Sequence, residues 1–190
     1  MPNWCFSDYA LVGSEEDVKK AHDSMSTLEE TPRSCPEEPW SFLNNSNWLG
    51  FVVEDIIKKS YKEYSCRGTF NDLDFYKDGD DKWVLAFTTE TAWGPCYDLI
   101  EALADLFNLR VNYTAEELGM CFFEKHDKDD IFPKNFYYSD ETNVEYFDTL
   151  EQFIEEYGEF YGLTKDSTFE ESQEAVNNTD NGMLFRYKCV

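Results

Sequence analysis

Apolar and polar residues alternate over residues 5–12 in the manner of a half-buried strand, with Tyr9 and Leu11 on one face. Gly13 ends this pattern, and Ser14 followed by Asp17 resembles the start of a capped helix. The apolar residues that follow recur at helical spacing, at Val18, Ala21, Met25 and Leu28. This segment therefore predicts a strand and then a helix that packs in the core.

The next part of the chain predicts a loop, a short helix and a hairpin. Residues 31–48 are rich in proline and asparagine, which favours a loop, and residues 50–60 favour a short helix. Two strand patterns then meet at Asp78-Gly79, a strong hairpin signal. The second strand, over residues 82–90, has apolar residues on both faces and is predicted to lie centrally in its sheet.

The stretch "TTETAWGPC", residues 88–96, joins this strand to an amphipathic helix predicted over 95–107. Pro95 suits the first helical position, where its missing N–H costs nothing. We expect Trp93 to be mostly buried at this junction, as a lid on the core, because large aromatic side chains usually pack. A further strand is predicted from Leu109 to Tyr113.

The order strand, helix, loop, strand, strand, helix, strand is that of the split βαβ arrangement. The predicted fold class is α+β. It comprises a ferredoxin-like antiparallel sheet with two helices on one face, over residues 1–125. Residues 126–190 are predicted to form an acidic C-terminal α/β extension packed on the same body.

This extension has its own helix and strand signals. Thr149 and Gln152 form a capping box, and Ser167 with Glu170 predicts the start of a second helix. Asn181-Gly182 then predicts a turn into a last strand, expected to join a sheet or pack under the last helix. In the first helix, the predicted inner face consists of Leu150, Phe153, Ile154, Tyr157 and Tyr161.

Several short motifs occur together in a recognisable order: "MPNWC" at the N-terminus, "YSCRGT" at 64–69, "TETAWGPC" at 89–96 and "YTAEELGM" at 113–120. With them, the chain resembles the YubB-type ferredoxin-like family of phage, plasmid and mobile-element proteins. The resemblance covers residues 1–125 and extends more loosely over 132–162. It implies a ferredoxin-like fold and brings no reaction, cofactor or catalytic residue with it. Gly94 stands where that family usually has serine, and Leu118 where proline is common.

Charge narrows the classes of partner. The chain has 40 acidic against 16 basic residues, a formal net charge of −24. Such a chain is repelled by nucleic-acid phosphates and by anionic membranes, which argues against direct nucleic-acid binding. A protein partner with a basic surface is attracted instead.

Residues 124–175 hold 16 acidic and 4 basic residues, and so half of the net charge. The predicted outer face of the helix after Thr149 consists of Asp148, Glu151, Glu155, Glu156 and Glu159. These carboxylates span ~16 Å at ~1.5 Å per residue, about one per 4 Å, against one phosphate per ~3.4 Å along a DNA strand. We therefore expect a non-enzymatic interaction protein of phage or mobile-element type. The alternatives are a DNA mimic that inhibits a host nucleic-acid enzyme or defence system, or an exposed face that serves solubility alone.

Catalytic chemistry has few candidates. Arg67, Glu90, Trp93, Glu116 and Glu117 fall at predicted strand ends or turns and form a candidate pocket. Through Glu90 and Glu116 they support a third alternative, a small-molecule-binding or hydrolytic enzyme. The sequence does not show that these two glutamates share one end of the sheet, and no nucleophile accompanies them, so a non-enzymatic role is favoured.

No metal or cofactor is expected. His126 lies in "EKHDKDD" beside Asp127, Asp129 and Asp130, but such charged loops are usually only solvated. The six cysteines are scattered without a C-x-x-C pair, which favours free thiols in a reducing compartment. No apolar run reaches the ~20 residues of a membrane span, and the N-terminus lacks a signal-peptide pattern. A cytoplasmic location is predicted.

Overall fold

The computed structural model describes residues 3–31, 46–79, 82–179 and 182–190. It divides into two compact units, Met1–Ile131 and Phe132–Val190. The prediction that residues 126–190 pack on the same body as the core stays a prediction. Most of the predicted 31–48 loop, and Asn181 of the last predicted turn, lie outside the described residues.

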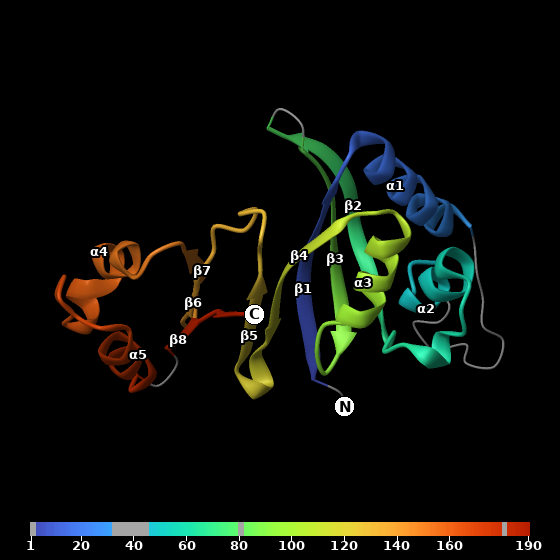
Figure 1. Ribbon diagram of the computed structural model, residues 1–190. Coiled ribbons are helices and arrows are strands. Elements are labelled where there is room, and N and C mark those ends of the chain that lie inside the picture. Colours follow the sequence, from blue (N-terminus) through green and yellow to red (C-terminus); the bar gives the residue numbers. More distant parts are fainter. Residues whose placement is uncertain (1–2, 32–45, 80–81, 180–181) are drawn as a thin grey trace. The chain divides into compact units, whose positions relative to one another are not determined.

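The first unit is a mixed α and β structure, shown in Figure 1. Its elements are β1 (Trp4–Gly13), α1 (Glu15–Glu30), α2 (Leu49–Phe51) with a π-helical turn (Val52–Ile57), a 3-10 turn (Tyr61–Glu63), β2 (Gly68–Asp78), β3 (Lys82–Ala92), α3 (Tyr97–Leu106), β4 (Arg110–Glu117), a second 3-10 turn (Leu118–Met120) and β5 (Phe122–His126).

The strands of this unit lie in the order β2-β3-β1-β4-β5, and all neighbours are antiparallel. The predicted central position of β3 is confirmed, because β3 lies between β2 and β1. Helices α1 and α3 lie on the same side of the sheet (Figure 1). The α+β class is thus confirmed as a large antiparallel sheet with helices.

The main core lies between this sheet and its helices. The odd-numbered residues of β1 from Cys5 to Leu11, among them Tyr9, face the helices and are buried. The Tyr9 ring stacks on Phe87 at a centroid distance of 5.3 Å and lies 5.5 Å from Tyr113. Because side chains alternate along a strand, the even-numbered residues of β1 occupy the opposite face.

Helix α1 forms as its sequence predicts. The Ser14 hydroxyl accepts a hydrogen bond from the Asp17 N–H at 3.2 Å and caps the first turn. The predicted apolar stripe of Val18, Ala21, Met25 and Leu28 is buried throughout. The β2–β3 hairpin is also present, and Gly79 adopts a φ of +75° that suits glycine in the turn.

Two predictions about the strand-to-helix junction are wrong. Trp93 is 55% exposed, not mostly buried. Its backbone has a φ of +76°, and its N–H donates to the Asn3 carbonyl at 2.9 Å. This left-handed turn directs the chain away from the strand alternation that would have placed the ring in the core. Pro95 does not open α3 either, because the helix begins at Tyr97 with Cys96 as its N-cap.

The second unit holds a small antiparallel sheet in the order β7-β6-β8 and two helices. Its elements are β6 (Phe136–Ser139), β7 (Val144–Phe147), α4 (Leu150–Tyr161), α5 (Phe169–Asn177), β8 (Met183–Arg186) and the short β9 (Lys188–Cys189). Its core contains Phe136, Tyr138, Phe147, Phe153, Ile154, Val176 and Leu184.

The last strand of this small sheet packs against α5. The Gln173 side-chain amide donates to the Leu184 carbonyl at 2.8 Å, and the Leu184 N–H donates to the Asn177 side chain at 3.1 Å. The predicted Ser167–Glu170 start of α5 is wrong by one residue. Thr168 is the N-cap, and Glu171 completes its capping box.

Candidate functional site

Helix α4 is firmly anchored in the second unit. Thr149 caps it through the Gln152 N–H, and the Gln152 side chain accepts the Thr149 N–H at 3.2 Å, so the predicted capping box is confirmed. Phe153 and Ile154 are buried in the core of this unit. Tyr157 adds a hydrogen bond from its hydroxyl to Glu145 on β7 at 2.6 Å. The inner face of the helix is thereby fixed, and so is the direction of its outer face.

The outer face of α4 is acidic and exposed, as predicted. All five acidic residues predicted for this outer face are exposed, and we call them the acidic face: Asp148, Glu151, Glu155, Glu156 and Glu159. Glu151, Glu155 and Glu159 follow one another at four-residue spacing and form one stripe. Asp148 precedes the helix, and its carboxylate accepts a hydrogen bond from the Asn135 amide at 3.0 Å.

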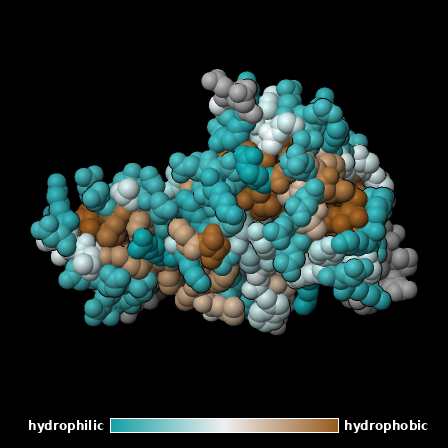
Figure 2. All heavy atoms as spheres, viewed as in Figure 1, coloured by the Kyte–Doolittle hydropathy of each residue, from teal (hydrophilic) through white to brown (hydrophobic). Residues whose placement is uncertain are grey.

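A hollow of about 250 Å³ lies beside this stripe, lined by Glu151, Ile154, Glu155 and Lys165. Ile154 provides an apolar floor, and the two glutamates provide negative charge. The part of the second unit at the left of Figure 2 is covered largely by hydrophilic residues around a small hydrophobic area. The helix thus combines exposed carboxylates with a recess large enough for part of a side chain.

Hydrogen bonds fix the tyrosines behind α4. The Tyr138 hydroxyl donates to Asp140 at 2.8 Å and lies 2.9 Å from the Tyr161 hydroxyl. Backbone N–H donation from Thr142, with the Tyr138 bond and the Asn143 N–H, lowers the pKa of Asp140 to about 2. Burial first, and then these hydrogen bonds, raise the pKa of Tyr138. Asp140 is therefore ionised and Tyr138 neutral at ordinary pH.

A second candidate site lies in the first unit, on the sheet face away from the helices. Glu90 on β3 and Glu116 on β4 both stand directly opposite Phe6 on β1, one on each side. The structure therefore brings to one row the two glutamates that the sequence could not place together. Phe6 is 52% exposed between them. Asp8 follows two residues along β1 and faces the same way.

The other members of the candidate pocket separate into different roles. Arg67 is exposed beside the start of β2, and its carbonyl accepts the Ala92 N–H at 2.9 Å, so it lies at the same end of the sheet as Trp93. Glu117 is buried and serves the chain itself. Its carboxylate accepts the N–H groups of Gly119 and Met120, each at 2.8 Å, which caps the turn after β4.

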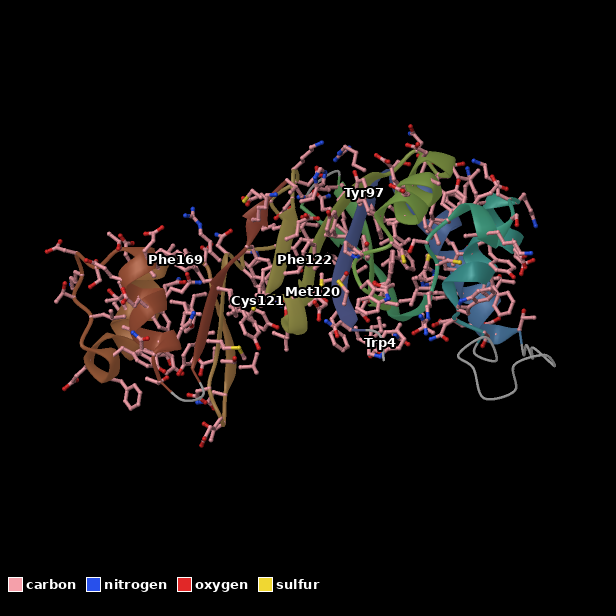
Figure 3. The ribbon with its side chains drawn as sticks, turned by 90° about the horizontal axis from the view of Figure 1, so that it is seen from below. Trp4, Tyr97, Met120, Cys121, Phe122 and Phe169 are labelled. Atoms are coloured by element: carbon pink, nitrogen blue, oxygen red, sulfur yellow. The ribbon has the colours of Figure 1, made fainter. Side chains whose placement is uncertain are left out.

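Exposed apolar side chains gather at this end of the sheet. Asn3 lies at this end, because its carbonyl accepts the Trp93 N–H at 2.9 Å and its side-chain amide lies next to Gly119. Figure 3 looks onto this end and labels Trp4, Met120 and Cys121 there. The exposed large apolar residues of β1, of the turn after β3 and of the turn after β4 are Trp4, Phe6, Trp93, Leu118 and Met120.

Sequence reasoning missed Phe6 and Trp4. The signal was present in the alternation of β1, because the phase that buries Tyr9 and Leu11 must turn residues 4, 6 and 8 to the opposite face. The alternation does not predict how far other parts of the chain cover that face.

The charged loop after β5 is engaged in structural contacts. The Asp127 carboxylate accepts the Ile131 N–H at 2.9 Å and lies 3.5 Å from the Lys125 amine. Asp129 accepts two hydrogen bonds from Arg110, the shorter at 2.7 Å, and these bonds lower its pKa. Buried Asn112 holds the loop through the N–H groups of Lys128 and Asp129.

Within the described residues, no group of three or more His, Cys, Asp and Glu side chains is arranged to hold a metal ion. That no metal or cofactor binds stays a prediction, which elemental analysis of the purified protein tests. The described cysteines are all free thiols. Burial raises the pKa of Cys5 and Cys66 to about 11 and that of Cys96 to about 12.

Comparisons with known proteins show no relative of this chain. No family model, no curated protein and no solved structure matches the chain. Among the described helices, none combines the length and the apolar character needed to span a bilayer.

Proposed function

We propose that this chain is a non-enzymatic interaction protein that binds a basic surface of another macromolecule through the acidic face of α4. The observation that carries the proposal is the stripe of Glu151, Glu155 and Glu159, exposed on a helix whose opposite side is locked into a core. The three carboxylates repel one another, because the helix holds them in a fixed row of like charge. A cationic partner relieves this electrostatic repulsion.

The hollow beside the stripe supports recognition of long basic side chains. A lysine or arginine can lay its aliphatic stem on Ile154 while its charged end reaches Glu151 or Glu155. Lys165, at the rim of the same hollow, adds one positive charge and favours a partner that places its cations toward the glutamates. The site therefore offers shape as well as charge.

A narrower form of this proposal is DNA mimicry, in which the acidic face occupies the groove of a host nucleic-acid enzyme or defence component. The exposed stripe supports it through spacing. Successive members stand four residues apart, about 6 Å at 1.5 Å per residue. Glu156 follows Glu155 on the helix, and Asp148 precedes the first member of the stripe. The partner would then be a DNA-binding protein.

We also propose that the first unit has ferredoxin-like topology and belongs with the YubB-type proteins of phages and plasmids. The element order and the strand order β2-β3-β1-β4, antiparallel throughout, support this topology. A cytoplasmic location is proposed with it, and the free described thiols support a reducing compartment.

The proposal is tested by affinity capture from a host lysate at low and at moderate salt, with mass spectrometry of the retained proteins. Charge-driven binding should weaken steeply between the two conditions, because both surfaces release counterions. The triple variant Glu151→Lys, Glu155→Lys, Glu159→Lys should lose the basic partner while keeping its fold, since all three side chains are exposed.

A matched control makes the same change in net charge elsewhere. Glu29 and Glu30 of α1 and Asp105 of α3 are exposed and lie in the first unit. Their replacement by lysine should leave capture close to that of the unaltered protein. Equal loss in both triple variants would show that net charge alone acts, and undiminished capture by the α4 variant would remove α4 from the mechanism.

A further inference from the structure

A hollow lies in the first unit between helix α3 and the strands β4 and β5. Its volume is about 210 Å³, and every residue that lines it belongs to the first unit. Pockets for drug-sized ligands measure roughly 300–1,000 Å³. The hollow therefore suits a smaller molecule. We call it the α3 hollow.

One wall of the α3 hollow is a single face of the helix. Tyr97, Glu101 and Asp105 follow one another at four-residue spacing, which places them on the same side of α3. Glu101 and Asp105 are exposed, and the Tyr97 hydroxyl donates a hydrogen bond to Glu101 at 3.3 Å. This wall therefore presents two carboxylates beside an aromatic ring.

The other wall comes from the start of β4 and the turn after β5, and it is basic. Arg110 and Lys128 line it, and both are exposed. Arg110 is paired with Asp129 at 2.7 Å, whereas Lys128 forms no salt bridge within the residues that the structure describes. The backbone of Lys128 is fixed, because its N–H donates to the side-chain oxygen of buried Asn112 at 2.8 Å. Lys128 thus offers an ammonium group on an anchored turn.

Apolar and aromatic groups line the rest of the α3 hollow. Ala104 and Leu109 are buried there, and Val111 is half-buried. The rings of Tyr97, which is labelled in Figure 3, and His126 also border it, with their centroids 6.1 Å apart. The hollow therefore combines opposite charges on two walls with an apolar lining.

We propose that the α3 hollow binds a small zwitterion, a molecule in which a short apolar chain joins an ammonium group to a carboxylate. The ammonium group pairs with Glu101 and Asp105, and the carboxylate pairs with Lys128. The apolar chain covers Ala104 and Val111. Only a molecule that carries both charges compensates both walls at once.

Ligands with one sign of charge fit this hollow less well. An anion meets the two carboxylates of α3, and the net charge of −24 repels it at long range. A cation is attracted by that net charge but is repelled by Lys128. An uncharged molecule removes water from charged groups without replacing its hydrogen bonds. The inference does not depend on the proposed function of α4, because α4 belongs to the second unit.

The test compares three molecules of equal chain length: ε-aminohexanoate, hexanoate and hexylamine. Each is titrated at moderate salt into the isotope-labelled full chain, and the NMR shifts of the Ala104, Val111 and Lys128 amides report binding at the hollow. The zwitterion should bind with a dissociation constant on the order of 1 mM. Each single-charge analogue should bind roughly two- to five-fold more weakly, the contribution of one exposed ion pair.

A second series covers zwitterions whose two charges share one carbon atom. It compares leucine with N-acetylleucine, which lacks the positive charge, and with leucine methyl ester, which lacks the negative charge. The α3 hollow should again prefer the zwitterion to both analogues in this series or in the first.

Variants that remove one charge test the role of each wall. Lys128→Gln should abolish the preference for the zwitterion over the amine, because the carboxylate then has no partner. Asp105→Asn with Glu101→Gln should abolish the preference over the carboxylate analogue. The matched controls are Lys77→Gln on β2 and Asp98→Asn on α3, which are exposed and do not line the hollow. They should leave both preferences unchanged.

The outcomes separate the zwitterion from attraction by net charge. An amine that binds as tightly as the zwitterion in both series would show that the acidic chain merely attracts cations, and would overturn the inference. Amide shifts confined to other parts of the chain, or unchanged preferences in Lys128→Gln, would overturn it as well. All of the substituted side chains are exposed, so each variant should keep the amide spectrum of the folded protein.

Discussion

A left-handed backbone at a bulky residue is the most informative feature at the scale of single residues. Trp93 holds a φ of +76° while its ring is largely in solvent. Such a conformation costs about 1–3 kcal/mol for a residue with a Cβ. Gly94 follows directly in the chain, yet the positive φ falls on the tryptophan. No propensity rule predicts a positive φ at Trp93 in place of Gly94. The expectation that the Trp93 ring is buried in the core was wrong for this reason.

The first prediction concerns Trp93. Trp93→Gly should leave the free energy of unfolding unchanged or raise it by up to about 1 kcal/mol, because glycine adopts a positive φ without strain. Phe70→Ala, at a fully buried aromatic on β2, is the contrasting variant and should lose about 3–5 kcal/mol. Urea unfolding measures both. A loss of several kcal/mol in Trp93→Gly would restore a packing role for the ring.

Thiol reactivity provides the second prediction. Because burial holds the pKa of Cys5 and Cys66 near 11 and that of Cys96 near 12, these thiols stay protonated at pH 8. Iodoacetamide should label exposed Cys121 and Cys189 in the folded protein and reach the three buried thiols only in denaturant. Peptide mapping after timed labelling checks this. Native labelling of Cys96 at the rate of Cys121 would contradict the packing of the core.

At the scale of elements, local signals determined most of what the sequence predicted. The cap at Ser14, the stripe of α1, the hairpin at Gly79 and the capping box of α4 all rest on near neighbours in the chain, and all four are present. The candidate pocket depends on strand register instead. Glu90 and Glu116 share a row only because β1 lies between β3 and β4, a long-range pairing that no local pattern encodes.

The third prediction tests how firmly α4 is fixed. Thr149→Ala removes the side chain that accepts the Gln152 N–H and should lower the free energy of unfolding by about 1 kcal/mol. Thr149→Ser keeps the hydroxyl and should retain most of that stability. Urea unfolding of the two variants side by side provides the measurement. An alanine variant as stable as the serine variant would mean that packing alone holds the start of the helix.

Charge is the dominant property of the whole molecule. A net charge of −24 destabilises the compact state through self-repulsion and attracts any cationic surface at long range. Composition alone predicted this attraction. The positions of the acidic surfaces could be predicted only in part. Helical periodicity predicted that the glutamates of α4 face outward, whereas the positions of Glu90 and Glu116 on either side of Phe6 follow only from the strand pairing.

We propose that the stripe on α4 forms the contact with a basic partner. The most direct test is the slope of log affinity against log salt concentration for a purified captured partner, measured for the unaltered protein and for the two triple variants. We predict a steep slope for the unaltered protein and for the Glu29, Glu30 and Asp105 control, because both release counterions on binding. The Glu151, Glu155 and Glu159 variant should bind weakly with a shallow slope. The same affinity and slope in all three proteins would contradict the claim.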